Sequence, residues 1–184
     1  MRIVFLALVL SIFISGCSVV AVQYQPDFQL VNELNDSGIE GVNLGDFSES
    51  DESLNKVTLR ASPMISPYEG SYGLYLKNAL KEQLFQSKLF DQGAPIKISG
   101  VLLKNYFNAS GVNVGKANLA ARFIAMRGDR EVYNEIHEIS HEWESSFMGS
   151  IAIPNAQNNY PVAVQKLIRD FLADPDFITA VLAN

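Results

Sequence analysis

The sequence 116-KANLAARFIAMRGDREVYNEIHEISHEWESS-146 has the pattern of a long β-hairpin. Two runs rich in apolar residues, Lys116–Met126 and Glu131–Ser146, flank the tetrapeptide Arg127-Gly128-Asp129-Arg130. Glycine and aspartate suit the tight turn of a hairpin, and glycine supplies a positive φ at no steric cost. In the second run, large apolar residues recur at alternate positions, which is typical of a strand with one buried face. The stretch therefore predicts two antiparallel strands.

Earlier segments add further strands to this hairpin. Pro95–Tyr106 alternates in its first half and is continuously apolar at positions 101–103, as expected of a central strand that is covered on at least one face. Lys56–Arg60 also alternates and should begin the ordered domain, and Gly41–Phe47 is a shorter strand candidate. Ser62–Pro67 predicts a turn, because each of its two prolines lacks an amide donor and disfavours helix before it.

Two amphipathic helices are expected. The first runs from about residue 69 or 71 to residue 88, and the second begins near Pro161, after a linker over Gly149–Asn159. The apolar face of the first helix consists of Tyr72, Leu76, Leu80 and Leu84, and that of the second consists of Val164, Leu167, Ile168, Phe171 and Leu172. The order of elements predicts an α+β domain, with a mostly antiparallel sheet of about four to five strands and two helices packed on one face.

Residues 137–141, HEISH, match the zinc-peptidase pattern H-E-x-x-H. On a helix, His137 and His141 would lie one turn apart and could share a zinc ion, with Glu138 activating water. On a strand the two histidines lie about 13 Å apart on one face, and Glu138 points to the other. The hairpin pattern favours the strand, and no third ligand stands out. We therefore interpret the histidines as polar residues on a half-exposed strand and predict no metal or cofactor; a zinc peptidase remains the less favoured alternative.

The sequence contains no motif for any other catalytic chemistry that we considered. The sequence has no glycine-rich phosphate loop and no G-x-S-x-G nucleophile elbow, so no catalytic residue and no enzymatic activity are predicted. The net charge of −6 and the lack of a basic stripe exclude a nucleic-acid-binding protein, because phosphate repels an acidic surface.

The N-terminus carries the most specific signal in the sequence. Arg2 precedes an apolar run from Ile3 to Ile14, which is too short to span a bilayer and fits the core of a signal peptide. The run ends in Ile14-Ser15-Gly16-Cys17, which resembles the lipobox of bacterial lipoproteins. This resemblance implies cleavage before Cys17, a diacylglycerol on its thiol and an acyl chain on its amine. Cys17 is the sole cysteine, so no intramolecular disulfide is expected.

These signals predict three parts of the chain. Residues 1–16 form a lipoprotein signal peptide, residues 17–55 a lipidated cysteine followed by an acidic tether, and residues 56–184 a single α+β domain. The tether is expected because residues 18–55 contain eight acidic side chains and no Lys or Arg, which is typical of a solvated segment.

The layout resembles the YajG-like group of small Gram-negative outer-membrane lipoproteins. The shared features are the lipobox, the acidic lead-in, the hairpin, the terminal helix and the segments Leu59–Ser62, Leu80–Leu84 and Ile98–Leu102. The resemblance implies a chain anchored to outer-membrane lipid through acylated Cys17 and facing the periplasm, because Ser18 in place of aspartate favours export to the outer membrane. It implies no enzymatic activity. The expected function is a non-catalytic binding or assembly module with an envelope protein partner; an accessory lipoprotein of an envelope ABC transporter is the alternative.

Overall fold

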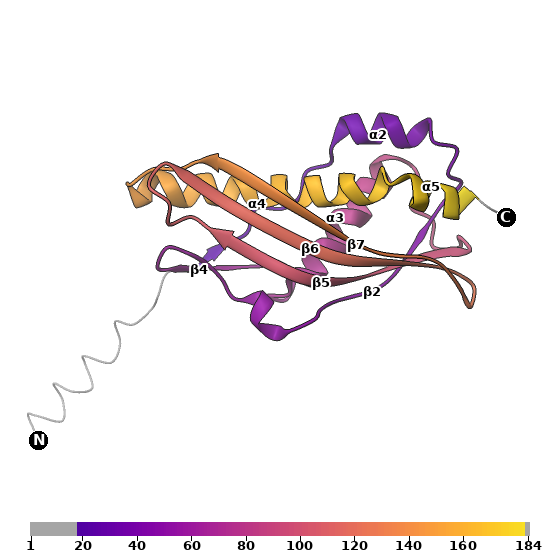
Figure 1. Cartoon of the computed structure of the whole chain (residues 1–184), viewed down its shortest axis with the longest axis horizontal. Helices are drawn as coiled ribbons and strands as arrows, with labels where there is room; N and C mark the ends of the chain where they lie inside the picture. Colours follow the sequence, from indigo (N-terminus) through magenta and orange to yellow (C-terminus); the bar gives the residue numbers. More distant parts are fainter. Residues whose placement is uncertain (1–17, 183–184) are drawn as a thin grey trace, which may run out of the picture.

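Three long antiparallel strands form the centre of the fold, β5 (Ile96–Asn108), β6 (Val114–Arg127) and β7 (Arg130–Glu144) (Figure 1). The computed structural model describes residues 18–182. The predicted signal peptide and Cys17 lie outside these residues. The hairpin prediction is confirmed: Arg127 pairs with Arg130 across the two-residue loop, and Gly128 has φ +60°. A positive φ at the first loop position is the arrangement that glycine favours in type II′ turns.

The prediction of one mostly antiparallel sheet needs correction, because the fold has two mixed sheets. β2 (Asn43–Glu49) pairs with β5 in parallel and completes a four-stranded sheet in the order β2-β5-β6-β7. A three-stranded sheet has the order β1-β4-β3, in which β1 (Val19–Val20) is parallel to β4 (Ser62–Ile65) and β3 (Val57–Leu59) is antiparallel to it. Parallel pairs require long crossover connections, and pairing across such a distance leaves no local sequence pattern.

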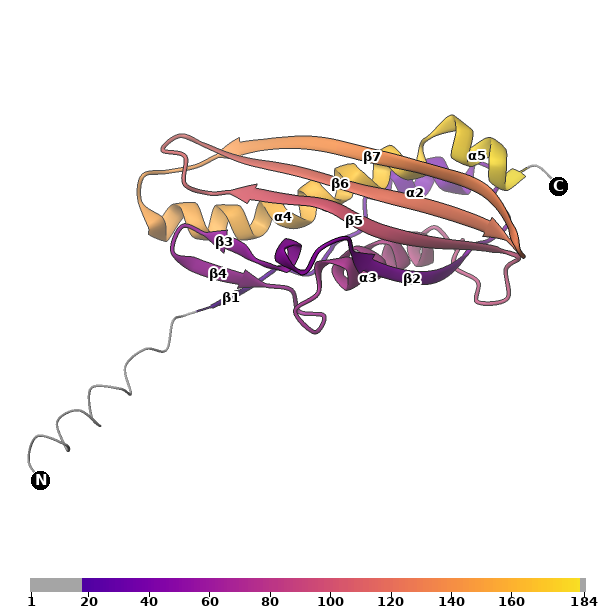
Figure 2. The same cartoon turned by 60° about the horizontal axis from the view of Figure 1, so that its bottom comes forward.

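The two long helices cover one face of the four-stranded sheet, as the sequence predicted. α3 (Tyr72–Gln86) packs over β2 and β5, and α4 (Gly149–Leu172) packs over β6 and β7 (Figures 1 and 2). The described residues contain two further α-helices and a short 3₁₀ helix, η1 (Glu52–Asn55). α2 (Phe28–Asn35) packs against α3, and α5 (Pro175–Leu182) lies against β7 and α4.

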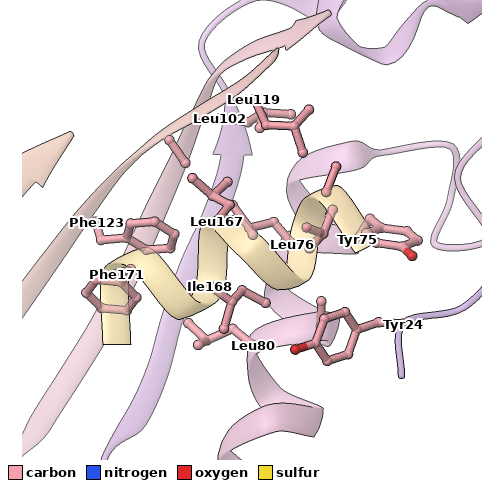
Figure 3. Packing of buried hydrophobic residues seen from close by; sticks show 14 of the residues in the cluster. Tyr24, Tyr75, Leu76, Leu80, Leu102, Leu119, Phe123, Leu167, Ile168 and Phe171 are labelled. Atoms are coloured by element: carbon pink, nitrogen blue, oxygen red, sulfur yellow. The ribbon is translucent and has the colours of Figure 1, made fainter. Parts of the chain in front are cut away.

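The core fills the space between these helices and the sheet (Figure 3). Leu80 of α3 and Leu167 of α4 are fully buried, and Phe171 stacks on Phe123 of β6 with ring centroids 4.0 Å apart. The four-residue apolar periodicity of both helices is thus the stripe that faces the sheet.

The acidic tether predicted over residues 17–55 is not observed in the part that the structure describes. Residues 19–55 form β1, α2, β2 and η1, and Leu30, Leu34 and Val42 are buried. Long-range polar contacts hold this segment: the Gln83 side chain binds the backbone N–H and C=O of Asp27, and Arg169 pairs with the Asp27 carboxylate at 2.7 Å. Six of the eight acidic residues in this segment are exposed, so composition alone suggested a solvated segment.

Two smaller boundaries also differ from the sequence prediction. The linker expected over Gly149–Asn159 is the first half of α4, which continues through both Pro154 and Pro161. Here Ala152, Ala156 and Tyr160 are buried at four-residue spacing, and this packing outweighs the two backbone hydrogen bonds that proline removes. The turn expected over Ser62–Pro67 is instead strand β4 followed by a turn.

Candidate functional site

The H-E-x-x-H segment lies on β7, which confirms the strand prediction. His137 and His141 point to the face that α4 covers. Glu138 lies on the exposed opposite face, where it forms an ion pair with Lys104 of β5 at 2.5 Å. The strand therefore separates the glutamate from both imidazoles, and the arrangement that a zinc peptidase requires is not assembled.

The interpretation of the histidines as half-exposed is wrong, because both are buried beneath α4. His137 Nδ1 lies 2.7 Å from Asp170 Oδ2, and its Nε2 lies 2.6 Å from the Tyr133 hydroxyl. Tyr133 donates its single hydroxyl hydrogen to Asp174 at 2.5 Å, which leaves its oxygen free to accept from Nε2. Both ring nitrogens thus face oxygen atoms, one of a carboxylate and one of a hydroxyl.

His141 has a different set of partners. Lys166 Nζ lies 2.9 Å from its Nδ1, and its Nε2 lies 2.9 Å from the side-chain oxygen of Asn159. An ammonium group only donates, so Nδ1 accepts and Nε2 donates to the amide oxygen. These roles define a neutral imidazole. The two histidines on the same face of β7 therefore meet different partners: His137 faces a carboxylate and a hydroxyl, whereas His141 faces an ammonium group and an amide oxygen.

Lys166 and Asp170 are not among the residues of the apolar face predicted for α4, and their contacts with β7 were not predicted. The four-residue spacing of Lys166 and Asp170 was the available signal, since it puts both on one side of the helix. Asp174 follows four residues later, just after the end of α4. Asp174 also accepts from the Asp176 amide at 2.8 Å and so supports the start of α5. The cluster joins β7, α4 and α5. Over residues 18–182, no group of three or more His, Cys, Asp or Glu side chains has a metal-binding arrangement.

The pH dependence of folding should report on His141. Loss of water around the ring lowers the pKa of His141; Lys166 adds to this effect, and the hydrogen bond to Asn159 opposes it. The unfolded state, with a pKa of about 6.5, then binds more protons than the folded state, so stability should fall as the pH drops through 6.5 towards the lowered pKa. Urea midpoints at pH values about one unit above and below 6.5 measure the loss. His141→Gln, which does not titrate, should remove part of it; an unchanged pH dependence in that variant would contradict this account.

A second candidate region is the end of the molecule where the described chain begins, which we call the proximal end. It comprises Ser18 with β1, the β3–β4 turn at residues 60–61, the β5–β6 loop at residues 109–113 and the β7–α4 loop at residues 145–148 (Figure 2). Arg60 joins three of these segments, because its guanidinium donates to the carbonyl oxygens of Ala109, Ser146 and Phe147. β1 is held by β4 and by Gln157 of α4, whose amide donates to Val20 O at 3.0 Å.

Surface hollows in the described part of the chain are open and polar. One lies between residues 23–26 and α3, where Tyr24, Tyr68, Lys81 and Phe85 are among the lining residues. Its shape gives no indication of a specific ligand. No helix among residues 18–182 combines the length and apolar character needed to cross a membrane.

No known family model matches the sequence, and no curated protein matches it either. Solved structures do share the fold. Protein XCC0632 of Xanthomonas campestris, described under the family DUF330, is 7% identical with a TM-score of 0.59, and the match covers 90% of this chain and 95% of that one. A candidate lipoprotein of Caulobacter crescentus CB15 is 13% identical with a TM-score of 0.50, and the match covers 84% of this chain and 99% of that one. These likenesses establish the fold alone, and the YajG-like resemblance stays a prediction.

Proposed function

We propose that this chain is a lipoprotein anchored through acylated Cys17 to the outer membrane, facing the periplasm, where it acts as a non-catalytic binding or assembly module. The observation that carries the proposal is the position of β1. The described fold begins at Ser18, and Val19 already pairs with Met64 of β4. A lipid on Cys17 would therefore attach directly to a folded domain.

The placement of the only chemical motif supports a non-catalytic role. The ring nitrogens of His137 and His141 are hydrogen-bonded to side chains of β7 and α4. Glu138 forms an ion pair with Lys104 on the opposite face of the sheet. The motif thus contributes to the attachment of α4 to the sheet. A domain held at a membrane without a catalytic constellation is suited to binding an envelope protein.

The lipid anchor is tested by Cys17→Ala. This variant should lose the outer-membrane fraction, because it lacks the thiol that would carry the diacylglycerol, and a lasting attachment needs more than one acyl chain. Sucrose-gradient fractionation of Gram-negative cells expressing the full chain measures the distribution. Ser18→Ala keeps the acylation site and should fractionate like the unaltered chain. Recovery of Cys17→Ala with outer membranes would refute the anchor.

A further inference from the structure

We propose that the proximal end carries a lipid-contacting surface, an apolar tip formed by Val112, Val114, Phe147, Met148 and Ile151, which enters the membrane interface beside the anchor. This inference rests on the proposed function, because it requires the lipid on Cys17. It adds to that function an orientation of the domain and a second point of membrane contact.

The apolar tip is exposed and contiguous. Phe147 is 76% exposed, Met148 59% and Val112 57%, and Val114 and Ile151 are also exposed. The loops that carry these residues are joined, because Ser145 N donates to Asn113 O at 2.8 Å and Val114 pairs with Glu144. Large side chains of this kind, gathered at one place on a small domain, mark a surface that binds another apolar phase.

The covalent chain places this tip close to the anchor. Cys17 precedes Ser18 directly, and consecutive Cα atoms lie about 3.8 Å apart, so the acylated residue stays next to β1. β4, the partner of β1, follows the β3–β4 turn, where Arg60 donates to the carbonyl oxygen of Phe147 at 2.8 Å. Val20 and Ile65, which pair between β1 and β4, are exposed as well. The anchor and the tip therefore belong to the same end of the domain (Figure 2).

Apart from Arg60, the segments that converge at the proximal end are free of charge, although the whole chain has a net charge of −6. No Asp, Glu, Lys, Arg or His occurs in residues 18–26, 61–68, 105–115 or 145–165. Arg60 is the charged residue at the β3–β4 turn, and its guanidinium is directed at backbone carbonyl oxygens. Burial of a charge in the membrane interface is costly, so an uncharged surface is what contact with lipid requires.

A lipid surface explains these features better than a protein partner does. The anchor at Cys17 keeps the proximal end against the bilayer, and this closeness favours lipid as the phase that covers the tip. Trp143, next to the tip, stacks on Phe107 with ring centroids 4.6 Å apart and is buried. The base of the tip is therefore packed against the core, whereas Phe147 and Met148 beyond it stay exposed.

The test depends on Cys17 being the only cysteine of the chain. Because acylation consumes Cys17, Phe147→Cys introduces the only free thiol, which accepts an environment-sensitive fluorophore. Phe85→Cys is the matched control: Phe85 is 63% exposed, and the chain just after it reaches Phe90, which pairs with Val42 directly before β2. β2 begins beside the first residues of β5, at the end of that strand away from the β5–β6 loop. Each lipidated full-length variant is reconstituted into vesicles of phosphatidylethanolamine and phosphatidylglycerol, some of which carry nitroxide-labelled acyl chains.

The label at residue 147 should shift its emission to shorter wavelength in the vesicles and lose most of its intensity to the nitroxide lipids, whereas the label at residue 85 should do neither. Equal, water-like emission at both positions in protein that floats with the vesicles would overturn the lipid-contacting tip and leave the anchor intact. Shielding of residue 147 in native membranes but not in vesicles would also overturn it and would assign the tip to a protein partner. Failure of the protein to float would refute the anchor and the tip with it.

Discussion

Leu167→Asp is expected to unfold the domain. Leu167 is fully buried on the face of α4 that packs against the sheet (Figure 3). An unpaired carboxylate at such a position costs several kcal/mol, against a total stability of about 5–15 kcal/mol for a domain of ordinary size. Circular dichroism during urea unfolding should show that the cooperative transition is lost or moves to much lower urea.

A matched substitution on the same helix separates burial from charge. Asn158→Asp adds the same negative charge to α4 at an exposed position and should change the free energy of unfolding by no more than about 0.5 kcal/mol. Leu80→Asp repeats the test on α3, where Leu80 is equally buried. Cooperative unfolding close to that of the unaltered chain in either leucine variant would show that the corresponding helix does not present this face to the sheet.

His137→Ala should lower the free energy of unfolding by about 2–4 kcal/mol. The ring is buried, packs edge-on against Phe123 and Phe171, and satisfies Asp170 and the Tyr133 hydroxyl. Its removal leaves a cavity and takes a partner from two polar groups. The shift of the urea midpoint, with the slope of the transition fitted separately, measures the loss.

Glu138→Ala is the control from the adjacent position of the same motif. Glu138 is exposed, and its ion pair with Lys104 is of the surface kind that contributes between zero and about 1 kcal/mol. The two neighbours should therefore differ clearly in their effect on unfolding. If His137→Ala were as mild as Glu138→Ala, the histidine cluster would not contribute to the attachment of α4 to the sheet.

Local patterns in the sequence were sufficient to predict the elements at the centre of the fold. The turn at Gly128 and the alternation on either side of it predicted β6 and β7, and the four-residue spacing of leucines predicted α3. Such elements are visible because the turn residues and the periodicity lie within a short window. The α+β class followed from the order of these elements.

What the sequence did not predict depends on contacts between distant segments. β2 is a short strand whose parallel pairing with β5 requires the crossover through α3, and α2 is held through Gln83 and Arg169. The burial of His137 and His141 depends on where α4 crosses β7. The first half of α4 is rich in asparagine and contains Pro154, so its polarity concealed the four-residue spacing of its buried alanines.

The position of β7 at the edge of the four-stranded sheet affects how two copies of the chain can meet. Lipid-anchored molecules diffuse in two dimensions, where copies meet often, and an open strand edge can then recruit the edge of a second copy. β7 carries five exposed glutamates, at positions 131, 135, 138, 142 and 144. Within residues 18–182, only two of them form ion pairs: Glu138 with Lys104 and Glu142 with Lys116. Two such edges brought together would set like charges directly opposite each other. If the chain is anchored as proposed, the acidic outer strand would oppose edge-to-edge pairing of neighbouring copies on the membrane.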